Sequence, residues 1–143
     1  MAWWVWLKFP PRYCVMDSQI GAWDKGGKMK PFKTSSLNKN ERSAIRTADE
    51  ILRKQFPIVN VILFGSKARG DSDAHSDIDL LLITSRPLHW KEEKSIIGVL
   101  FDIGIEYDVI FSPLFASGDE WEGGIFTQFP VYEEIMRDGA IVA

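Results

Sequence analysis

The sequence predicts a single small α/β domain. An amphipathic helical pattern over residues 38–56 is followed by two apolar runs of strand length, 58–64 and 77–84, and helical spacing returns from residue 90. The chain has 143 residues, of which 45% are hydrophobic and 13% aromatic, enough for one well-filled core. We expect the domain to occupy residues 34–143.

Residues 1–33 differ from the rest of the chain. They combine a tryptophan-rich start with Pro10 and Pro11, and then with a glycine- and lysine-rich stretch that is typical of a linker. We expect a flexible or atypical extension; the alternative is that its tryptophans dock on a partner or on the core. The start lacks the features of a signal peptide, and no apolar run approaches the roughly 20 residues that span a bilayer. A single cysteine, Cys14, adds to the expectation of a cytoplasmic protein.

The first half of the domain has clear element boundaries. Asn38 can cap the first helix, with Glu41 three residues later in the capping-box position, and Pro57 ends it. The β-branched run 58–64 predicts a strand buried on both faces. The remaining predictions for this half are a short helix over 66–70, a loop over 71–76 and a central strand over 77–84.

The second half is predicted to hold two helices and two strands. Residues 90–102 have helical spacing, and alternation over 105–111 predicts a third strand that carries Asp108. A short helix over 131–137 and a possible strand at 141–142 follow, with a loop over 117–124. Inward-facing side chains are expected at Ile96, Ile97, Leu100 and Phe101 of the helix, and packing roles for Trp90, Tyr107 and Trp121.

Two polar motifs flank the loop between the first two strands. Gly65 and Ser66 directly follow the first strand, where backbone N–H groups and a hydroxyl can meet a phosphate. Asp77 and Asp79 begin the second strand, and residues two apart in a strand project to the same face. Two adjacent carboxylates repel each other unless a cation lies between them, and Mg²⁺ accepts such carboxylates together with phosphate oxygens. The motifs together indicate a metal–nucleotide site.

The run from Gly65 to Asp79, G-S-x-A-R-G-x5-S-D-I-D, resembles the signature of the DNA polymerase beta-type nucleotidyltransferase superfamily. It is most similar to the minimal nucleotidyltransferase (MNT) branch, which shows the same twelve-residue interval from Gly65 to Asp77. The resemblance implies the nucleotidyltransferase fold: a small mixed β-sheet with helices mainly on one face and an exposed metal–nucleotide cleft at the sheet edge.

The resemblance also implies roles for three acids. Asp77 and Asp79 would bridge two Mg²⁺ ions, and Asp108 would bind the metal that carries the acceptor or take the acceptor's proton. Glu106 lies on the same face of the predicted third strand and is the alternative to Asp108. Neither His75 nor His89 has a partner at zinc-ligand spacing, so no zinc site is expected.

The glycine-rich half of the motif would bind the triphosphate of ATP. Gly65 lets the backbone approach closely, and Ser66 offers a hydroxyl. Arg69 could clamp a phosphate, although a surface salt bridge to Asp71 or Asp73 explains it almost equally well. Lys67 is expected to be solvated.

The activity implied is transfer of AMP from ATP to a hydroxyl. Only 35 residues follow Asp108, too few for the substrate domain of larger members, so we expect another chain to present the acceptor. Minimal members typically pair with a helical HEPN protein, and some are antitoxins that AMPylate a tyrosine of it. A catalytically idle binding antitoxin or scaffold, and a small-molecule nucleotidyltransferase, are the alternatives.

The charge distribution bears on partners. Residues 1–57 contain 11 Lys and Arg against 5 Asp and Glu, whereas residues 58–143 contain 6 against 15. The acidic half carries the predicted site, which suits a cation and argues against direct nucleic-acid binding through that half. The oligomeric state stays open.

Overall fold

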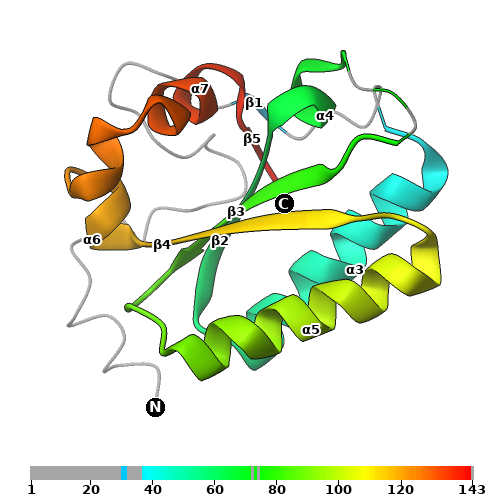
Figure 1. Ribbon diagram of the computed structural model, residues 1–143, viewed down its shortest axis with the longest axis horizontal. Coiled ribbons are helices and arrows are strands. Elements are labelled where there is room, and N and C mark those ends of the chain that lie inside the picture. Colours follow the sequence, from blue (N-terminus) through cyan, green and yellow to red (C-terminus); the bar gives the residue numbers. More distant parts are fainter. Residues whose placement is uncertain (1–29, 32–36, 72, 74, 143) are drawn as a thin grey trace.

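The computed structural model describes residues 30–31, 37–71, 73 and 75–142, and the predictions for the extension lie almost wholly outside them. The described chain forms one mixed sheet with strand order β1-β5-β2-β3-β4, flanked by helices, as the sequence predicts (Figure 1). The elements in chain order are β1 (Lys30–Pro31), α3 (Lys39–Gln55), β2 (Ile58–Phe64), α4 (Gly65–Arg69), β3 (Ile78–Thr84), α5 (Trp90–Tyr107), β4 (Phe111–Ser117), α6 (Gly118–Trp121), the 3-10 helix η2 (Ile125–Gln128), α7 (Pro130–Asp138) and β5 (Ala140–Ile141).

The centre of the sheet is the antiparallel pair β2–β3, connected through α4 and the loop that follows it. Its register places Phe64 opposite Asp79, so the end of β2 meets the start of β3. β3 continues the sheet by parallel pairing with β4, which lies at the edge of the described sheet. Pro113 lies within β4, where an edge strand tolerates a residue without an N–H donor.

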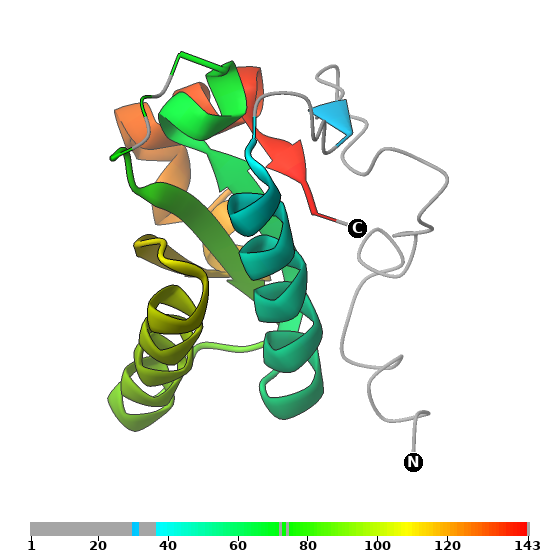
Figure 2. The same ribbon diagram turned by 90° about the vertical axis from the view of Figure 1, so that its right-hand side faces the viewer.

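Helices cover both faces of the sheet. The two long helices α3 and α5 lie side by side on one face, as Figure 2 shows, and α6, η2 and α7 lie on the other. The larger apolar core is on the α3–α5 face, where Leu63, Leu80 and Leu82 are buried. Their neighbours Ile62 and Leu81 point to the opposite face and pack under α6 and α7. The expectation that helices lie mainly on one face of the sheet therefore holds only for the two long helices, α3 and α5.

The predicted boundaries of α3 are confirmed. The Asn38 side chain accepts a hydrogen bond from the Glu41 N–H, and the Glu41 carboxylate accepts one from the Asn38 N–H, which completes the capping box. The helix ends before Phe56, whose extended backbone is what a following proline favours. Of the helices in the described residues, none is both long and apolar enough to cross a lipid bilayer.

The predicted third strand over 105–111 is wrong. Residues 105–107 continue α5, and the strand β4 begins only at Phe111. The reason is that Ile103 is buried and Tyr107 is half-buried on the packed side of the helix, and the Tyr107 hydroxyl lies 3.1 Å from that of Thr47 on α3. The predicted loop over 117–124 likewise contains α6, whose Trp121 is buried against Tyr132 as a packing residue.

The predicted inward face of α5 is half wrong. Ile96 and Leu100 are buried, but 49% of Ile97 and 67% of Phe101 are exposed, and so is 61% of Trp90. The helix packs only along the side that faces α3 and β4, so the side chains about a third of a turn further round stay outside the core.

Candidate active site

The antiparallel β2–β3 pair brings the two predicted motifs together. Because Phe64 pairs with Asp79, Gly65 at the start of α4 lies directly beside the Asp79 carboxylate. Asp77 is exposed and immediately precedes β3. One end of the sheet therefore carries Gly65, Ser66, Asp77 and Asp79, as the sequence predicts.

Gly65 is required by its surroundings as well as by its backbone. Its φ of +72° is a conformation that L side chains rarely adopt, and a Cβ placed on it would lie 2.2 Å from Oδ2 of Asp79. The carboxylate thus lies over the glycine α-carbon. No side chain forms a cap hydrogen bond at the α4 N-terminus that Gly65 opens, so no capping side chain accepts from its first N–H groups.

Asp79 is held in an environment that disfavours its charge. Partial burial raises its pKa, and the neighbouring carboxylates of Asp77 and then Glu134 raise it further, while the positive charge of Arg69 lowers it. Negative charge therefore exceeds positive charge around this side chain. A bound cation would relieve that repulsion, and oxygen donors are the ligands that Mg²⁺ prefers, so the pair fits the ion implied by the motif.

Arg69 is engaged by two carboxylates. It donates to Oδ2 of Asp71 at 3.2 Å and to Oε1 of Glu134 at 2.8 Å, and these partners raise the pKa of the guanidinium. The predicted alternative of a salt bridge to Asp71 is thus observed, whereas Asp73 makes other contacts. Glu134 lies on α7, 65 residues away in sequence, and no local pattern pointed to it.

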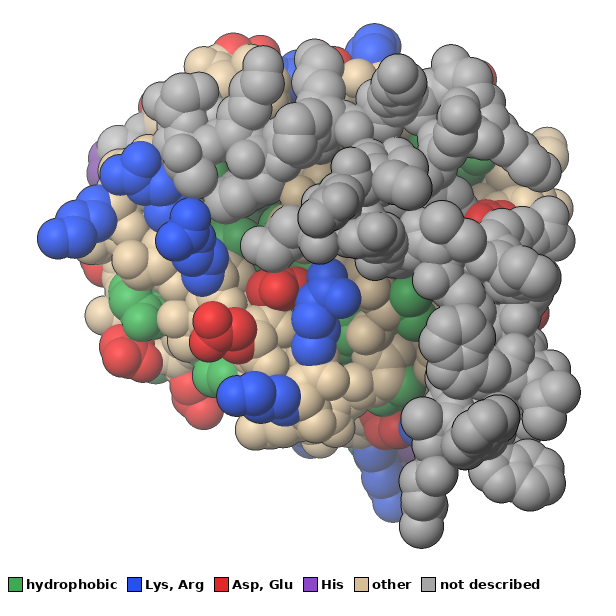
Figure 3. Space-filling view, turned by 180° about the vertical axis from the view of Figure 1, so that it is seen from behind, with side chains coloured by type: hydrophobic (Ala, Val, Ile, Leu, Met, Phe, Trp, Pro, Cys, Tyr) green, Lys and Arg blue, Asp and Glu red, His purple; other side chains and the backbone are tan. Residues whose placement is uncertain are grey.

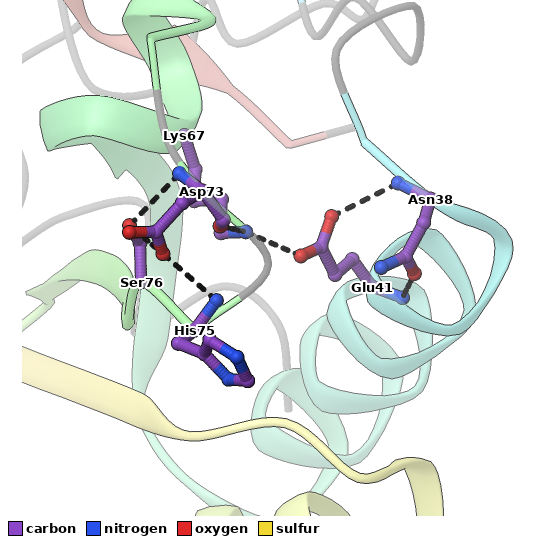
Figure 4. Close-up of polar contacts among 6 residues, drawn as sticks. All are labelled: Asn38, Glu41, Lys67, Asp73, His75 and Ser76. Carbon is purple, nitrogen blue, oxygen red and sulfur yellow. Dashed lines mark hydrogen bonds and ion pairs between the residues drawn. The ribbon is translucent and has the colours of Figure 1, made fainter.

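The expectation that Lys67 is solvated is wrong. Lys67 is 2% exposed, and its ammonium forms a buried ion pair with Glu41 of α3 and donates to the backbone oxygen of Asp73 at 3.0 Å. Figure 4 shows the Glu41 carboxylate between Asn38 and Lys67. One buried charge pair therefore connects α3, α4 and the loop that leads to Asp77.

That loop is also fixed by its own polar contacts. The Asp73 carboxylate accepts hydrogen bonds from the His75 N–H at 2.8 Å and the Ser76 hydroxyl at 3.1 Å (Figure 4). These contacts lower the pKa of Asp73. His75 is exposed and sits in the loop, as expected. The Lys67 ammonium, which comes from α4, and the Asp73 carboxylate, which is part of the loop, therefore both fix the residues directly before Asp77.

Asp108 does not join the Asp77–Asp79 pair. It is exposed at the C-cap of α5, with a left-handed φ of 56°, and Glu106 is exposed on the helix itself. Across the described ranges, no three His, Cys, Asp or Glu side chains gather closely enough to hold a metal ion. The placement of Asp108 on a strand is wrong, and its role as third acid stays a prediction.

Comparison with known proteins agrees with the geometry. Residues 46–117 match the family described as "Polymerase beta, Nucleotidyltransferase", a segment that includes every residue from Gly65 to Asp108. The chain is also 43% identical over 54 residues to a Methanocaldococcus jannaschii protein named "Putative protein adenylyltransferase". That alignment covers 38% of this chain and 54% of the relative, so the chain matches about half of the relative's length.

Proposed function

Because the chain belongs to the polymerase beta nucleotidyltransferase family, we propose that it transfers AMP from ATP to a hydroxyl of a partner protein. The acceptor oxygen would attack the α-phosphorus, the bond from that phosphorus to the bridging oxygen would break, and pyrophosphate would leave with the electron pair. The observation that carries the proposal is the Asp79 carboxylate packed against Gly65, with the Asp77 carboxylate close enough to raise the pKa of Asp79.

Asp77 and Asp79 would hold the Mg²⁺ ions that such a site uses. When bound, these ions supply charge neutralisation for the attacking and leaving oxygens. The protein's contribution is to keep the exposed Asp77 carboxylate near the partly desolvated Asp79 carboxylate, with Gly65 leaving room beside Asp79. A proton leaves the acceptor hydroxyl, and Asp108 is the predicted acceptor for it if the α5–β4 connection brings that side chain to the substrate.

Gly65, Ser66 and Arg69 would bind the triphosphate. Gly65 and Ser66 begin α4 at the end of the sheet where the two aspartates lie, a position at which backbone N–H groups and a hydroxyl would meet a phosphate. Arg69 must exchange its contact with Glu134 for a phosphate oxygen, which an exposed ion pair permits at little cost.

The acceptor is proposed to lie on a HEPN-like helical partner, which would make this chain the antitoxin of a toxin–antitoxin pair. Two observations support a protein acceptor: the resemblance of the Gly65–Asp79 motif to minimal nucleotidyltransferases, and the name of the M. jannaschii relative. The test is incubation of the full chain with Mg²⁺, α-labelled ATP and the protein encoded beside it. We expect label on that neighbour with the wild-type chain and none with Asp77→Asn/Asp79→Asn.

A catalytically idle antitoxin is the second candidate. It is favoured by the finding that Asp108 forms no three-acid group with Asp77 and Asp79 among the described residues, and by the ion pair of Arg69 with Glu134. The two functions separate cleanly in a neutralisation assay. An idle antitoxin would neutralise its partner equally well after Asp77→Asn/Asp79→Asn, whereas a transferase would lose neutralisation although the complex still forms.

A further inference from the structure

The outer side of α5 carries a row of exposed apolar side chains, the α5 stripe. Its members recur at helical spacing and are between 49% and 68% exposed. The row extends over about 22 Å at 1.5 Å per residue. The α5 stripe consists of Trp90, Ile97, Phe101 and Ile105.

Such a row is unusual for a surface helix. The described surface seen in Figure 3 shows the ordinary case, with acidic and basic side chains intermixed, and α3 likewise exposes Arg46, Glu50 and Lys54. Aligned large apolar groups on a surface commonly mark a protein contact. The α5 stripe is also separate from the α3 and β4 contacts, because the buried side of α5 is formed by other residues, Ile96, Leu100 and Ile103.

Gly98 lies beside the middle of the stripe. It is exposed, and a Cβ built on it would meet nothing within 4 Å. A glycine inside an exposed helix is less favourable than alanine, and no contact within the described chain requires a glycine at this position. The open glycine would let a second helix backbone approach closely at this point, as small residues do at helix crossings.

Two exposed charged residues on the outer side of α5 are placed symmetrically in sequence about Gly98. Lys94 lies four residues before it and Asp102 four residues after it; both are exposed, and neither has an ion-pair partner in the described part of the chain. A second α5 running antiparallel and crossing at Gly98 would place Lys94 opposite Asp102 of the other copy, twice.

We propose that the α5 stripe is a self-association surface on which a second copy of this chain docks through an antiparallel α5–α5 pair. The same crossing places Trp90 level with Ile105 of the other copy, because these residues lie eight and seven positions from Gly98. The interface is isologous, as in most homodimers. It does not depend on nucleotide transfer, so it stands or falls independently of the proposed activity.

The test is the mass of the full chain in solution by sedimentation or light scattering across a range of concentrations. We expect a species of twice 16.3 kDa at tens of micromolar for the wild type. Phe101→Glu should give a monomer with an unchanged circular dichroism spectrum, because the side chain is 67% exposed and outside the core. Arg46→Glu, a change at an exposed position on α3, is the control and should leave the dimer intact.

A charge exchange tests the orientation. Lys94→Glu and Asp102→Lys should each weaken the dimer at least tenfold, and the double variant Lys94→Glu/Asp102→Lys should return to within about threefold of wild type. A wild-type chain that stays monomeric at 100 μM, or a dimer indifferent to Phe101→Glu, overturns the proposal. The proposal is also overturned if the chain alone is monomeric and Phe101→Glu abolishes its binding to a different protein. The α5 stripe would then be the docking surface for that protein. Failure of the double variant to recover would overturn the antiparallel crossing.

Discussion

Replacing Lys67 by methionine should destabilise the domain strongly. The side chains of Lys67 and Glu41 are only 3% and 7% exposed, and their ion pair joins α3 to α4. Methionine keeps most of the volume but leaves the Glu41 carboxylate buried without its cation. Removal of one partner from a buried pair typically costs about 3–5 kcal/mol. With a urea m-value of about 2 kcal/mol per molar, the unfolding midpoint should fall by roughly 1.5–2.5 M.

The companion variant separates charge from capping. Glu41→Gln retains an acceptor for the Asn38 N–H, as capping boxes allow, but removes the negative charge beside Lys67. In the double variant Lys67→Met/Glu41→Gln no charge remains buried, so the loss should be smaller than the sum of the two single losses by at least about 1 kcal/mol. Urea denaturation at pH 7, followed by circular dichroism, measures all four chains. A loss below about 1 kcal/mol for Lys67→Met, or strict additivity, would refute the reasoning.

Three further predictions concern the site itself. Gly65→Ala should reduce AMP transfer at least 100-fold, measured by label incorporation, because its Cβ would displace the Asp79 carboxylate and its φ is strained; full activity would contradict this. In metal-free urea titrations, Asp79→Asn should be more stable than wild type at pH 7. Because the pKa of Asp79 is raised in the folded state, the wild type loses stability as the pH rises through that pKa. The stabilities of the two chains should therefore become equal below about pH 4, where the carboxyl group is protonated. A stability difference that does not change with pH would contradict this prediction. Glu134→Gln should strengthen ATP binding in calorimetry, because it releases Arg69 and removes a repelling charge, with little change in stability; weaker binding would assign Glu134 to the nucleotide site.

Local sequence rules predicted the first half of the domain well. Capping residues, a proline stop and β-branched runs determine α3, β2 and β3 through contacts between near neighbours, and the motif spacing placed Gly65 beside Asp79. The prediction of the boundary between α5 and β4 was wrong for a physical reason. Residues 105–111 satisfy an alternating pattern, but packing of Tyr107 against α3 decides in favour of helix, and sequence alone does not show that contact.

The site was predictable only as far as its motif. The Lys67–Glu41 pair spans 26 residues and the Arg69–Glu134 pair spans 65, so neither follows from spacing. A lysine between Ser66 and Ala68 in a short helix has no local signal of burial. The exposure of the α5 stripe was not predicted, because helical periodicity identifies the apolar positions of a helix but does not show which of them face the core.

The most direct test of the central claim is a comparison of α-labelled with γ-labelled ATP. The full chain, Mg²⁺ and the neighbouring protein would be incubated with each nucleotide in parallel, and the protein-bound label counted. Nucleotidyl transfer predicts label on the neighbour from the α position only, with pyrophosphate released in equal amount and both signals lost in Asp77→Asn/Asp79→Asn. Label from the γ position, or α-label that persists in the double variant, would contradict the assignment of this site as a nucleotidyltransferase centre.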